Sequence, residues 1–404
     1  MRAHDGFAVS ANGEARKATF SSTLPTALAL ALSGAIAVFV LFLALSLETP
    51  TAFASEASPT LQASSIETAS AQDLVGSMTV EQKVGQLIFA HASKKGELAR
   101  IARQQYGGYL LFASDFKGTT KKKLKKRLAK LQNASATPML IAVDEEGGSV
   151  VRASYYKKFR KSRFKSPSAL RKKGGYKAVR KDALTKSSFL KGLGINTNFA
   201  PVVDVPYKKR NYIYKRAYST KANQVARYSE VVVEAMNTRG VVGALKHFPG
   251  YGGNGDTHGK VVRDKRGLAT FQGRDLLPFQ SGINAGCPMI MMSHNVVFAF
   301  DRGKPASISA PAHDYLRNVM GFNGVIITDS LGMNGVRRFA PSAGELAVQA
   351  FLAGNDMLCT PYPEKMYDAL LAAVKSGRIS EKRLDESVQR ILSMKARYGI
   401  MNVG

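Results

Sequence analysis

Short apolar runs that alternate with helical patterns are the feature that most constrains how this chain can fold. The runs are nearly continuous and rich in β-branched residues, as expected of strands buried on both faces. They cover 106–112, 138–143, 195–200, 241–247, 288–293, 324–328 and 356–360, and helical patterns such as 120–133, 224–238, 273–285 and 344–353 lie between them. Seven strands separated by helices predict a parallel sheet.

Polar residues stand at the ends of these strands and favour a closed barrel over an open sheet. They are Asp144, Asn198, Lys246, His247, His294 and Asp329. In a (β/α)8 barrel the carboxyl ends of all strands converge on one mouth, whereas an open sheet spreads them along an edge. We therefore predict a single catalytic (β/α)8 TIM-type barrel, an α/β fold, over 72–404, with 86–90 as a weak candidate for the remaining strand.

The N-terminal region indicates export. Residues 24–47 are uncharged and apolar, Arg16 and Lys17 precede them, and Ala52-Phe53-Ala54 follows as a small-residue cleavage pattern. This order is typical of a secretory signal, and the run is also long enough to span a bilayer. We predict a signal peptide or signal-anchor over 1–54 and an Ala/Ser/Thr-rich linker over 55–71. The protein would then be extracytoplasmic, either secreted or membrane-anchored.

The charge of the chain is strongly positive and concentrated in blocks. The net charge is +29, with eight basic residues and no acid over 117–130, and twelve with none over 157–181. Such blocks can associate electrostatically with an anionic cell wall or membrane surface, or they can be solvated faces. No nucleic-acid-binding module accompanies them, so no specific nucleic-acid partner is expected. The two cysteines, Cys287 and Cys359, are predicted to be buried thiols.

A histidine and a carboxylate in a glycine-rich loop are the strongest chemical signal. The fourth strand ends in Lys246-His247, and a loop with four glycines then leads to Asp256 and His258. A carboxylate beside a histidine fixes the ring tautomer and stabilises the imidazolium, which suits proton transfer near neutral pH. A solvated turn is the simpler alternative. A phosphate-binding loop is excluded because its glycine and Ser/Thr positions are not matched.

Two further strand ends carry acids. After the second strand, Asp144-Glu145-Glu146 precedes a Gly-Gly turn and Arg152, which suggests carboxylates and a guanidinium that bind sugar hydroxyls. An acidic turn or a metal site is the alternative. After the sixth strand, Asp329 is either the N-cap of the next helix or a catalytic acid or nucleophile. Further polar positions are Asp204, Arg216 and Glu345.

Together these motifs resemble glycoside hydrolase family 3, in its single-domain β-N-acetylhexosaminidase branch. The resemblance covers most of 75–400, through 78–87, 144–152, 198–205, 246–258, 324–329 and 353–356. It implies that Asp329 is the nucleophile and that His258, oriented by Asp256, is the acid/base of a retaining mechanism. No metal or organic cofactor is implied.

The resemblance also implies which side chains hold the terminal N-acetylglucosamine: Asp144, Arg152, Arg216, Lys246 and His247. The chain departs from many relatives at Ser149, where they have Arg, and at Tyr251, where they have His. The lysine-dense blocks are not a family feature either. These departures concern what lies beyond the terminal sugar and leave the chemistry intact.

The expected function is an exported retaining exo-β-N-acetylhexosaminidase that removes terminal β-GlcNAc from peptidoglycan fragments or related oligosaccharides. A β-glucosidase or GlcNAc phosphorylase on the same scaffold is the alternative among enzymes. A non-catalytic protein that binds cell wall or polyanions is the alternative of another class.

Overall fold

A computed structural model describes residues 71–91 and 104–402. The predicted signal segment and nearly all of the predicted linker lie outside these residues and stay predictions. Among the helices of the described part, none has the length and apolar character needed to cross a membrane.

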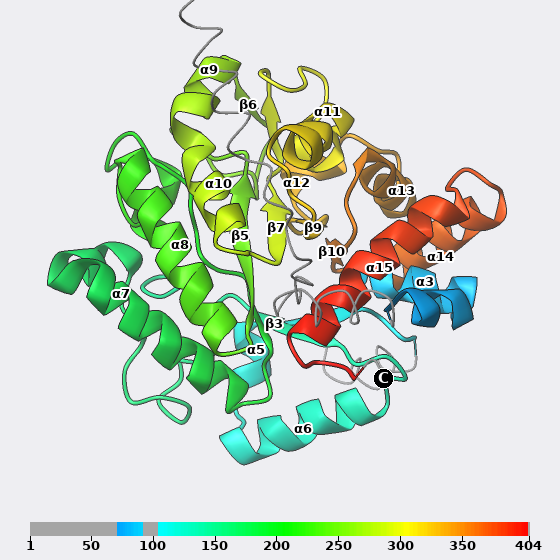
Figure 1. Cartoon of the computed structure of the whole chain (residues 1–404), viewed down its shortest axis with the longest axis horizontal. Helices are drawn as coiled ribbons and strands as arrows, with labels where there is room; N and C mark the ends of the chain where they lie inside the picture. Colours follow the sequence, from blue (N-terminus) through cyan, green and yellow to red (C-terminus); the bar gives the residue numbers. More distant parts are fainter. Residues whose placement is uncertain (1–70, 92–103, 403–404) are drawn as a thin grey trace, which may run out of the picture. The chain divides into compact units, whose positions relative to one another are not determined.

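Eight parallel strands form one sheet that closes on itself (Figure 1). Their order is β10-β1-β2-β3-β4-β5-β7-β9, and a parallel bridge between Ile327 and Met357 joins the two ends. The strands are β1 (Ile88–Ala90), β2 (Gly108–Leu111), β3 (Leu140–Val143), β4 (Thr197–Asn198), β5 (Val242–Phe248), β7 (Met289–Met292), β9 (Val325–Thr328) and β10 (Leu358–Thr360). The predicted barrel is confirmed, and the weak candidate at 86–90 contains its first strand.

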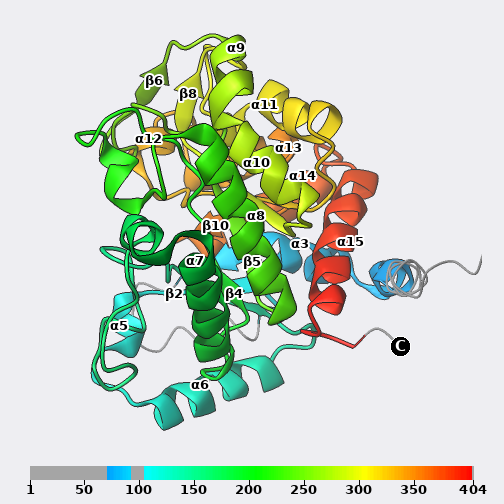
Figure 2. The same ribbon diagram turned by 60° about the vertical axis from the view of Figure 1, so that its left-hand side comes forward.

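Helices pack outside the strands, as Figures 1 and 2 show for α8 and α10 beside β5, with α7 next to α8. The long helices are α3 (Val80–Leu87), α6 (Lys121–Asn133), α7 (Pro167–Lys191), α8 (Ala222–Thr238), α10 (Leu277–Asn284), α13 (Ala343–Ala353), α14 (Pro363–Lys375) and α15 (Glu381–Arg397). The shorter elements are α5 (Ala113–Phe116), η1 (Tyr212–Arg216), β6 (Val262–Asp264), α9 (Leu268–Thr270), η2 (Phe271–Asp275), β8 (Asn295–Val297), η3 (Ala306–Ile308), α11 (Ala310–Asp314), η4 (Tyr315–Val319) and α12 (Asn334–Arg337).

The first lysine-rich block forms helix α6, and its sequence explains why. Thr120 caps the helix by accepting a hydrogen bond from the Lys123 backbone N–H. Leu124, Leu128 and Leu131 are spaced four and three apart and are buried, while most lysines of the helix are exposed. Because the leucines supply one apolar stripe, the lysines of this block are a solvated helix face.

Only part of the helix predicted over 273–285 is a regular α-helix. Helix α10 begins at Leu277 with Pro278 in its first turn, and a π-helical segment, η2, precedes it. Proline lacks the backbone N–H that a helix interior needs, so it marks the start of the regular helix.

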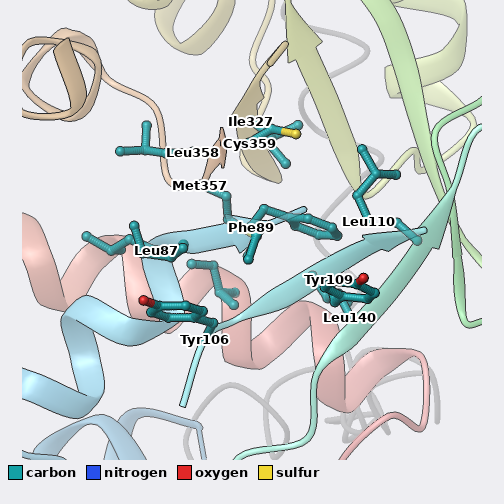
Figure 3. Close-up of a cluster of buried hydrophobic side chains, with 14 of the residues drawn as sticks. Leu87, Phe89, Tyr106, Tyr109, Leu110, Leu140, Ile327, Met357, Leu358 and Cys359 are labelled. Atoms are coloured by element: carbon teal, nitrogen blue, oxygen red, sulfur yellow. The ribbon is translucent and has the colours of Figure 1, made fainter. Parts of the chain in front are cut away.

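The core beneath the barrel mouth joins strands that are distant in sequence. Figure 3 shows Phe89 of β1 among side chains of β2 and of the segment that leads into β10. The backbone of β2 approaches this ring so closely that a Cβ at Gly108 would lie 2.4 Å from it, so glycine is required there. Cys287 and Cys359 are buried and free, which confirms the prediction of two buried thiols.

Lys395 of α15 is a fully buried lysine whose Nζ donates to Gln86 Oε1 at 2.6 Å. Burial lowers its pKa from 10.5 to about 7. A folded-state pKa below the unfolded value means that protonation is disfavoured in the folded state. Folding stability should therefore fall as the pH is lowered from about 10 to about 7, and the penalty is complete below that range.

We expect Lys395→Met to remove this pH dependence, which chemical unfolding at several pH values can measure. Relative to the wild type, the variant should gain roughly 1–4 kcal/mol near pH 6 and less near pH 10. Lys382→Met, an exposed change on the same helix, is the control and should alter the unfolding free energy little at either pH. An equal gain in the free energy of unfolding at both pH values would contradict a lowered pKa of Lys395.

Candidate active site

One cavity of about 620 Å³ brings together most of the residues expected at the site. It opens where the carboxyl ends of the strands meet, which is the usual place for the active site of this fold. Its lining includes Asp144, Arg152, Arg216, Lys246, His247, His258 and Asp329. Asp256, the last of the eight expected residues, does not line the cavity; its carboxylate contacts the ring of His258. His258 and Asp329 therefore face the same space, although they come from different strand ends.

Asp329 follows β9 and is held by backbone contacts. Its N–H donates to Met292 O at 3.0 Å, and its Oδ1 accepts from the Ser330 N–H at 2.7 Å. Burial would raise the pKa of this carboxyl, but His247, His294, the Ser330 N–H and Lys246 outweigh it, so the pKa lies below its ordinary value. The carboxylate is thus ionised at neutral pH, as a nucleophile must be.

The alternative that Asp329 caps a helix is wrong. The next helix, α12, starts at Asn334, and its N-cap position is Met333. The carboxylate is therefore not used to cap that helix.

A buried cluster of opposite charges forms one wall of the cavity. Lys246 Nζ lies 2.7 Å from both Asp144 Oδ1 and Glu146 Oε1. Glu146 also pairs with Arg216 through two bonds of 2.7 and 2.9 Å. Burial alone would raise the pKa of Glu146, but Arg216 and Lys246 hold it well below its usual range. The cluster is therefore a fixed set of charges whose outer members can bind hydroxyl groups.

Glu145 does not belong to the cavity, so the expectation that all three acids bind hydroxyls is wrong for it. Its side chain is fully buried and accepts the backbone N–H groups of Arg152, Ala153 and Ser154. The Ser154 hydroxyl also donates to it. Glu145 thereby fixes the loop after β3 and carries Arg152 to within 3.7 Å of Asp144.

His247 is oriented by a carboxylate that the motifs singled out only as a further polar position. Its Nδ1 lies 2.7 Å from Asp204 Oδ2, and Arg216 donates to its Nε2 at 3.2 Å. Because a guanidinium can only donate, Nε2 is the acceptor and Nδ1 carries the proton. Lys246 and His247 both line the cavity although they are consecutive, and the β5–β7 pairing shifts register at this point.

The loop after β5 presents His258 with one ring nitrogen already engaged. Its Nδ1 lies 2.6 Å from Asp256 Oδ1, and both side chains are substantially exposed, at 60% and 44%. Burial would raise the pKa of Asp256, but the His258 backbone and ring, with Tyr212, lower it. An ionised Asp256 holds the His258 tautomer that leaves Nε2 for the substrate.

Arg266 ties together the two ends of this loop. Its Nε lies 2.9 Å from both carboxylate oxygens of Asp264, and another of its nitrogens donates to Asp275 at 2.8 Å. A third contact reaches the carbonyl oxygen of Gly250 at 3.3 Å. The guanidinium passes so close to Gly252 that a Cβ there would lie 2.5 Å from it. The base of the loop is thus fixed.

The middle of the loop is held by Tyr251, a position at which the chain departs from the family that it resembles. Its hydroxyl lies 2.6 Å from Thr257 Oγ1, and both residues are buried. Thr257 O also accepts from the Gly335 N–H at 2.9 Å. Since Thr257 lies between Asp256 and His258 in the chain, its two contacts fix the position of the Asp256–His258 pair.

We expect Tyr251→Phe to lower kcat about 2–10-fold, the effect of one hydrogen bond, on an aryl β-N-acetylglucosaminide, the type of substrate that the family resemblance implies. KM should stay within about twofold, because the charged wall of the cavity is unchanged. Steady-state kinetics measure both values, and thermal unfolding checks that the fold is intact. Tyr176→Phe removes an exposed hydroxyl outside the cavity and is the control. A rise in KM with unchanged kcat would contradict a positioning role.

The motifs missed one group near Asp329, His91, and misplaced two others. His91 lines the cavity, contacts Ser330 Oγ at 3.2 Å, and has its pKa lowered to about 4 by burial. In the sequence, the only indication of His91 was its position directly after the weakly predicted first strand. His294 and Asn198 were expected at the mouth but do not line the cavity. His294 is buried against Ser307 and Ser330, and Asn198 accepts the Glu145 N–H.

Comparison with known proteins decides the family. The family model described as the N-terminal domain of glycosyl hydrolase family 3 matches residues 79–394. The chain belongs to glycosyl hydrolase family 3. It is therefore a glycoside hydrolase by family, and its barrel is the catalytic architecture that the resemblance implied.

Several relatives and solved structures resemble this family 3 chain. It is 35% identical over 285 residues to a beta-hexosaminidase of Xylella fastidiosa (strain 9a5c). That alignment covers 68% of this chain and 81% of the relative. It is 32% identical to beta-hexosaminidase A of Pseudoalteromonas piscicida, over 74% of this chain and 54% of that one.

Among structures, the family 3 beta-N-acetylglucosaminidase from Paenibacillus sp. str. FPU-7 matches with a TM-score of 0.76 and 33% identity. The match covers 80% of this chain and 63% of that one. The M tuberculosis protein LpqI matches with a TM-score of 0.74 and 26% identity, over 80% and 96%.

Proposed function

We propose that this family 3 hydrolase is a retaining exo-β-N-acetylhexosaminidase. The observation that carries the proposal is the cavity shared by an ionised Asp329 and by His258, whose ring Asp256 contacts from outside it. Relatives named beta-hexosaminidase and a neighbour named beta-N-acetylglucosaminidase support the specificity.

The chemistry proceeds in two displacement steps. In the first, the Asp329 carboxylate attacks the anomeric carbon and the bond to the leaving oxygen breaks, while His258 Nε2 donates its proton to that oxygen. In the second, water attacks the same carbon, His258 Nε2 takes the proton, and the Asp329 carboxylate is released. Two inversions retain the β configuration. Asp256 stabilises the imidazolium that each proton transfer requires.

The charged wall of the cavity recognises the terminal sugar. Asp144 accepts hydrogen bonds from hydroxyl groups, and Arg152, Arg216 and Lys246 supply donors. His247, whose two ring nitrogens are engaged by Asp204 and Arg216, lies in the same wall and packs beside the sugar. Because Glu146 already neutralises part of the positive charge, the wall offers fixed hydrogen-bonding groups without a large excess of either sign. Such preorganisation stabilises charge that develops in the transition state.

The natural substrate proposed here is a peptidoglycan fragment or a related oligosaccharide with terminal β-GlcNAc, cleaved outside the cytoplasm. Support for export is the apolar segment 24–47 with its flanking charges and cleavage pattern. The strongly positive chain would associate electrostatically with an anionic wall or membrane surface.

Turnover of 4-nitrophenyl β-N-acetylglucosaminide against the matching glucoside tests the specificity. We expect the N-acetylglucosaminide to be preferred, no acceleration by phosphate, and the β anomer as the first product in an NMR time course. A faster glucoside or a phosphate-dependent rate would overturn the specificity or the hydrolysis, respectively. An α anomer first would overturn the retaining mechanism.

A further inference from the structure

The exposed charge on three of the loops that border the cavity is almost entirely positive. Three loops that follow β3, β4 and β5 contribute cavity-lining residues, namely Arg152, Arg216 and His258 among others. The same loops carry exposed basic side chains, which we call the cationic rim: Lys157, Lys158, Lys161, Arg163, Lys165, Lys208, Lys209, Arg210, Lys215, Lys260, Arg263 and Lys265. Within the described part of the chain, none of these side chains forms an ion pair with a carboxylate.

The acids of these loops do not offset the rim. Glu145, Glu146, Asp204 and Asp264 are buried, and each accepts hydrogen bonds from the protein. Asp144 is partly exposed and pairs with Lys246, and the more exposed carboxylate of Asp256 pairs with His258. Since the negative charges are turned inward and the positive charges outward, the rim presents a net positive field at the entrance of the cavity.

The three loops are joined to one another, so the rim is a continuous surface. Arg216 on the loop after β4 pairs with Glu146 on the loop after β3. Asn211 on the loop after β4 donates to Gly253 O on the loop after β5 at 3.3 Å. Tyr155 and Tyr207 are 49% and 41% exposed on the same loops. Arg163 and Arg274 lie over their rings at 4.1 and 3.8 Å.

We infer that the cationic rim binds a phosphodiester polymer and, resting on the proposed function, that such a polymer bearing terminal β-linked N-acetylhexosamine is a substrate. A row of cations without acidic partners suits a ligand with a negative charge in every repeat, as a phosphodiester chain has. Glycans whose carboxylates stand on alternate sugars offer a lower charge density. The half-exposed tyrosines give the uncharged parts of the chain a surface to pack on.

A linear chain fits this surface better than an anionic bilayer does. The cavity opens beside the rim, so a flat membrane held by these cations would lie against its entrance and hinder the substrate. A flexible chain can instead lie along the loops and deliver its terminal sugar into the cavity. Binding would release counterions and weaken as salt is added.

The test uses the full chain and a triple variant with one change in each loop, Lys161→Gln, Lys209→Gln and Lys265→Gln. The matched control is Lys130→Gln, Lys191→Gln and Arg239→Gln, three exposed cations at the carboxyl ends of α6, α7 and α8. Both variants lose three positive charges, but the control changes lie toward the opposite face of the barrel.

The probes are poly(glycerol phosphate) of defined length, for binding by fluorescence anisotropy, and the same chain carrying β-GlcNAc, for kinetics. We expect the rim triple to weaken binding, and to raise KM for the decorated chain, by about tenfold or more at low salt. The control triple should change either value less than about twofold, and neither triple should alter hydrolysis of the neutral aryl substrate.

Several outcomes would overturn the inference. Equal losses in both triples would show that only the net charge matters. Tighter rim-dependent binding of a carboxylate polymer, an oligonucleotide or phosphatidylglycerol vesicles would assign the rim to another partner. Failure of the proposed function is visible separately, because the wild type would then not hydrolyse the aryl substrate at all.

Discussion

Asp329→Asn is expected to lower kcat/KM on an aryl β-N-acetylglucosaminide by about 10⁴-fold or more. An amide has the size of the carboxylate but cannot form the glycosyl ester, so the covalent step is lost. Steady-state kinetics of the purified variant provide the measurement. Because the pKa of Asp329 is held below its ordinary value, the acid limb of the wild-type pH profile for kcat/KM should also lie at lower pH than the ordinary titration of an aspartate.

Ser330→Ala is the matched control for this change. Ser330 is the next residue, and its backbone N–H, which donates to Asp329 Oδ1, is kept in the variant. We expect it to retain most of the activity. Thermal unfolding should show both variants folded. If Asp329→Asn kept more than about a tenth of the wild-type rate, Asp329 would lose the nucleophile role.

His258→Ala is expected to lower the rate on substrates with poor leaving groups by about 10²–10⁴-fold, the usual contribution of a general acid/base. The loss in the first step should be much smaller for a 2,4-dinitrophenyl leaving group, which departs without protonation. Burst kinetics that compare a substrate with a poor aryl leaving group and the 2,4-dinitrophenyl substrate separate the two steps. Asp256→Asn should give a smaller loss in the same direction, since the imidazole remains but its cation is stabilised less.

The His258 variant also allows a rescue experiment. Added azide can attack the glycosyl-enzyme without a general base, so it should restore turnover of the activated substrate and yield a β-glycosyl azide. His313→Ala is a poor control because His313 is buried, whereas Lys260→Ala changes an exposed residue of the same loop and should leave the rate within about threefold. Equal losses for both aryl groups, with no azide product, would show that His258 does not transfer the proton.

The barrel was predictable because its strands are buried on both faces, which leaves continuous apolar runs in the sequence. The short β1 strand was the weakest signal, since three buried residues after α3 do not differ in composition from the end of that helix. The start of α10 was misjudged because a π-helical segment of five residues is too short to show a spacing that differs from that of a regular helix.

Most of the charged and histidine residues that line the cavity could be predicted from the sequence, but most of their hydrogen-bond and ion-pair partners could not. Asp144, Lys246, His258 and Asp329 stood out because polar residues directly after apolar strands are unusual, and the fold brings such positions together. The same rule gave a wrong placement for Asn198 and His294, which satisfy buried hydrogen bonds behind the cavity wall. A residue's place along a strand end does not say which way its side chain turns.

Composition and motif order by themselves determined the class of fold, the family resemblance and the residue types available for catalysis. Only the tertiary structure decided that Glu145 holds a loop while Glu146 neutralises Lys246 and Arg216. It also decided that Asp204 fixes the tautomer of His247 and that Tyr251 holds Thr257. The physical reason is that apolar periodicity depends only on residues that are close together in the sequence. The ionisation of a carboxylate, in contrast, depends on charges that distant segments bring to within a few ångströms of it.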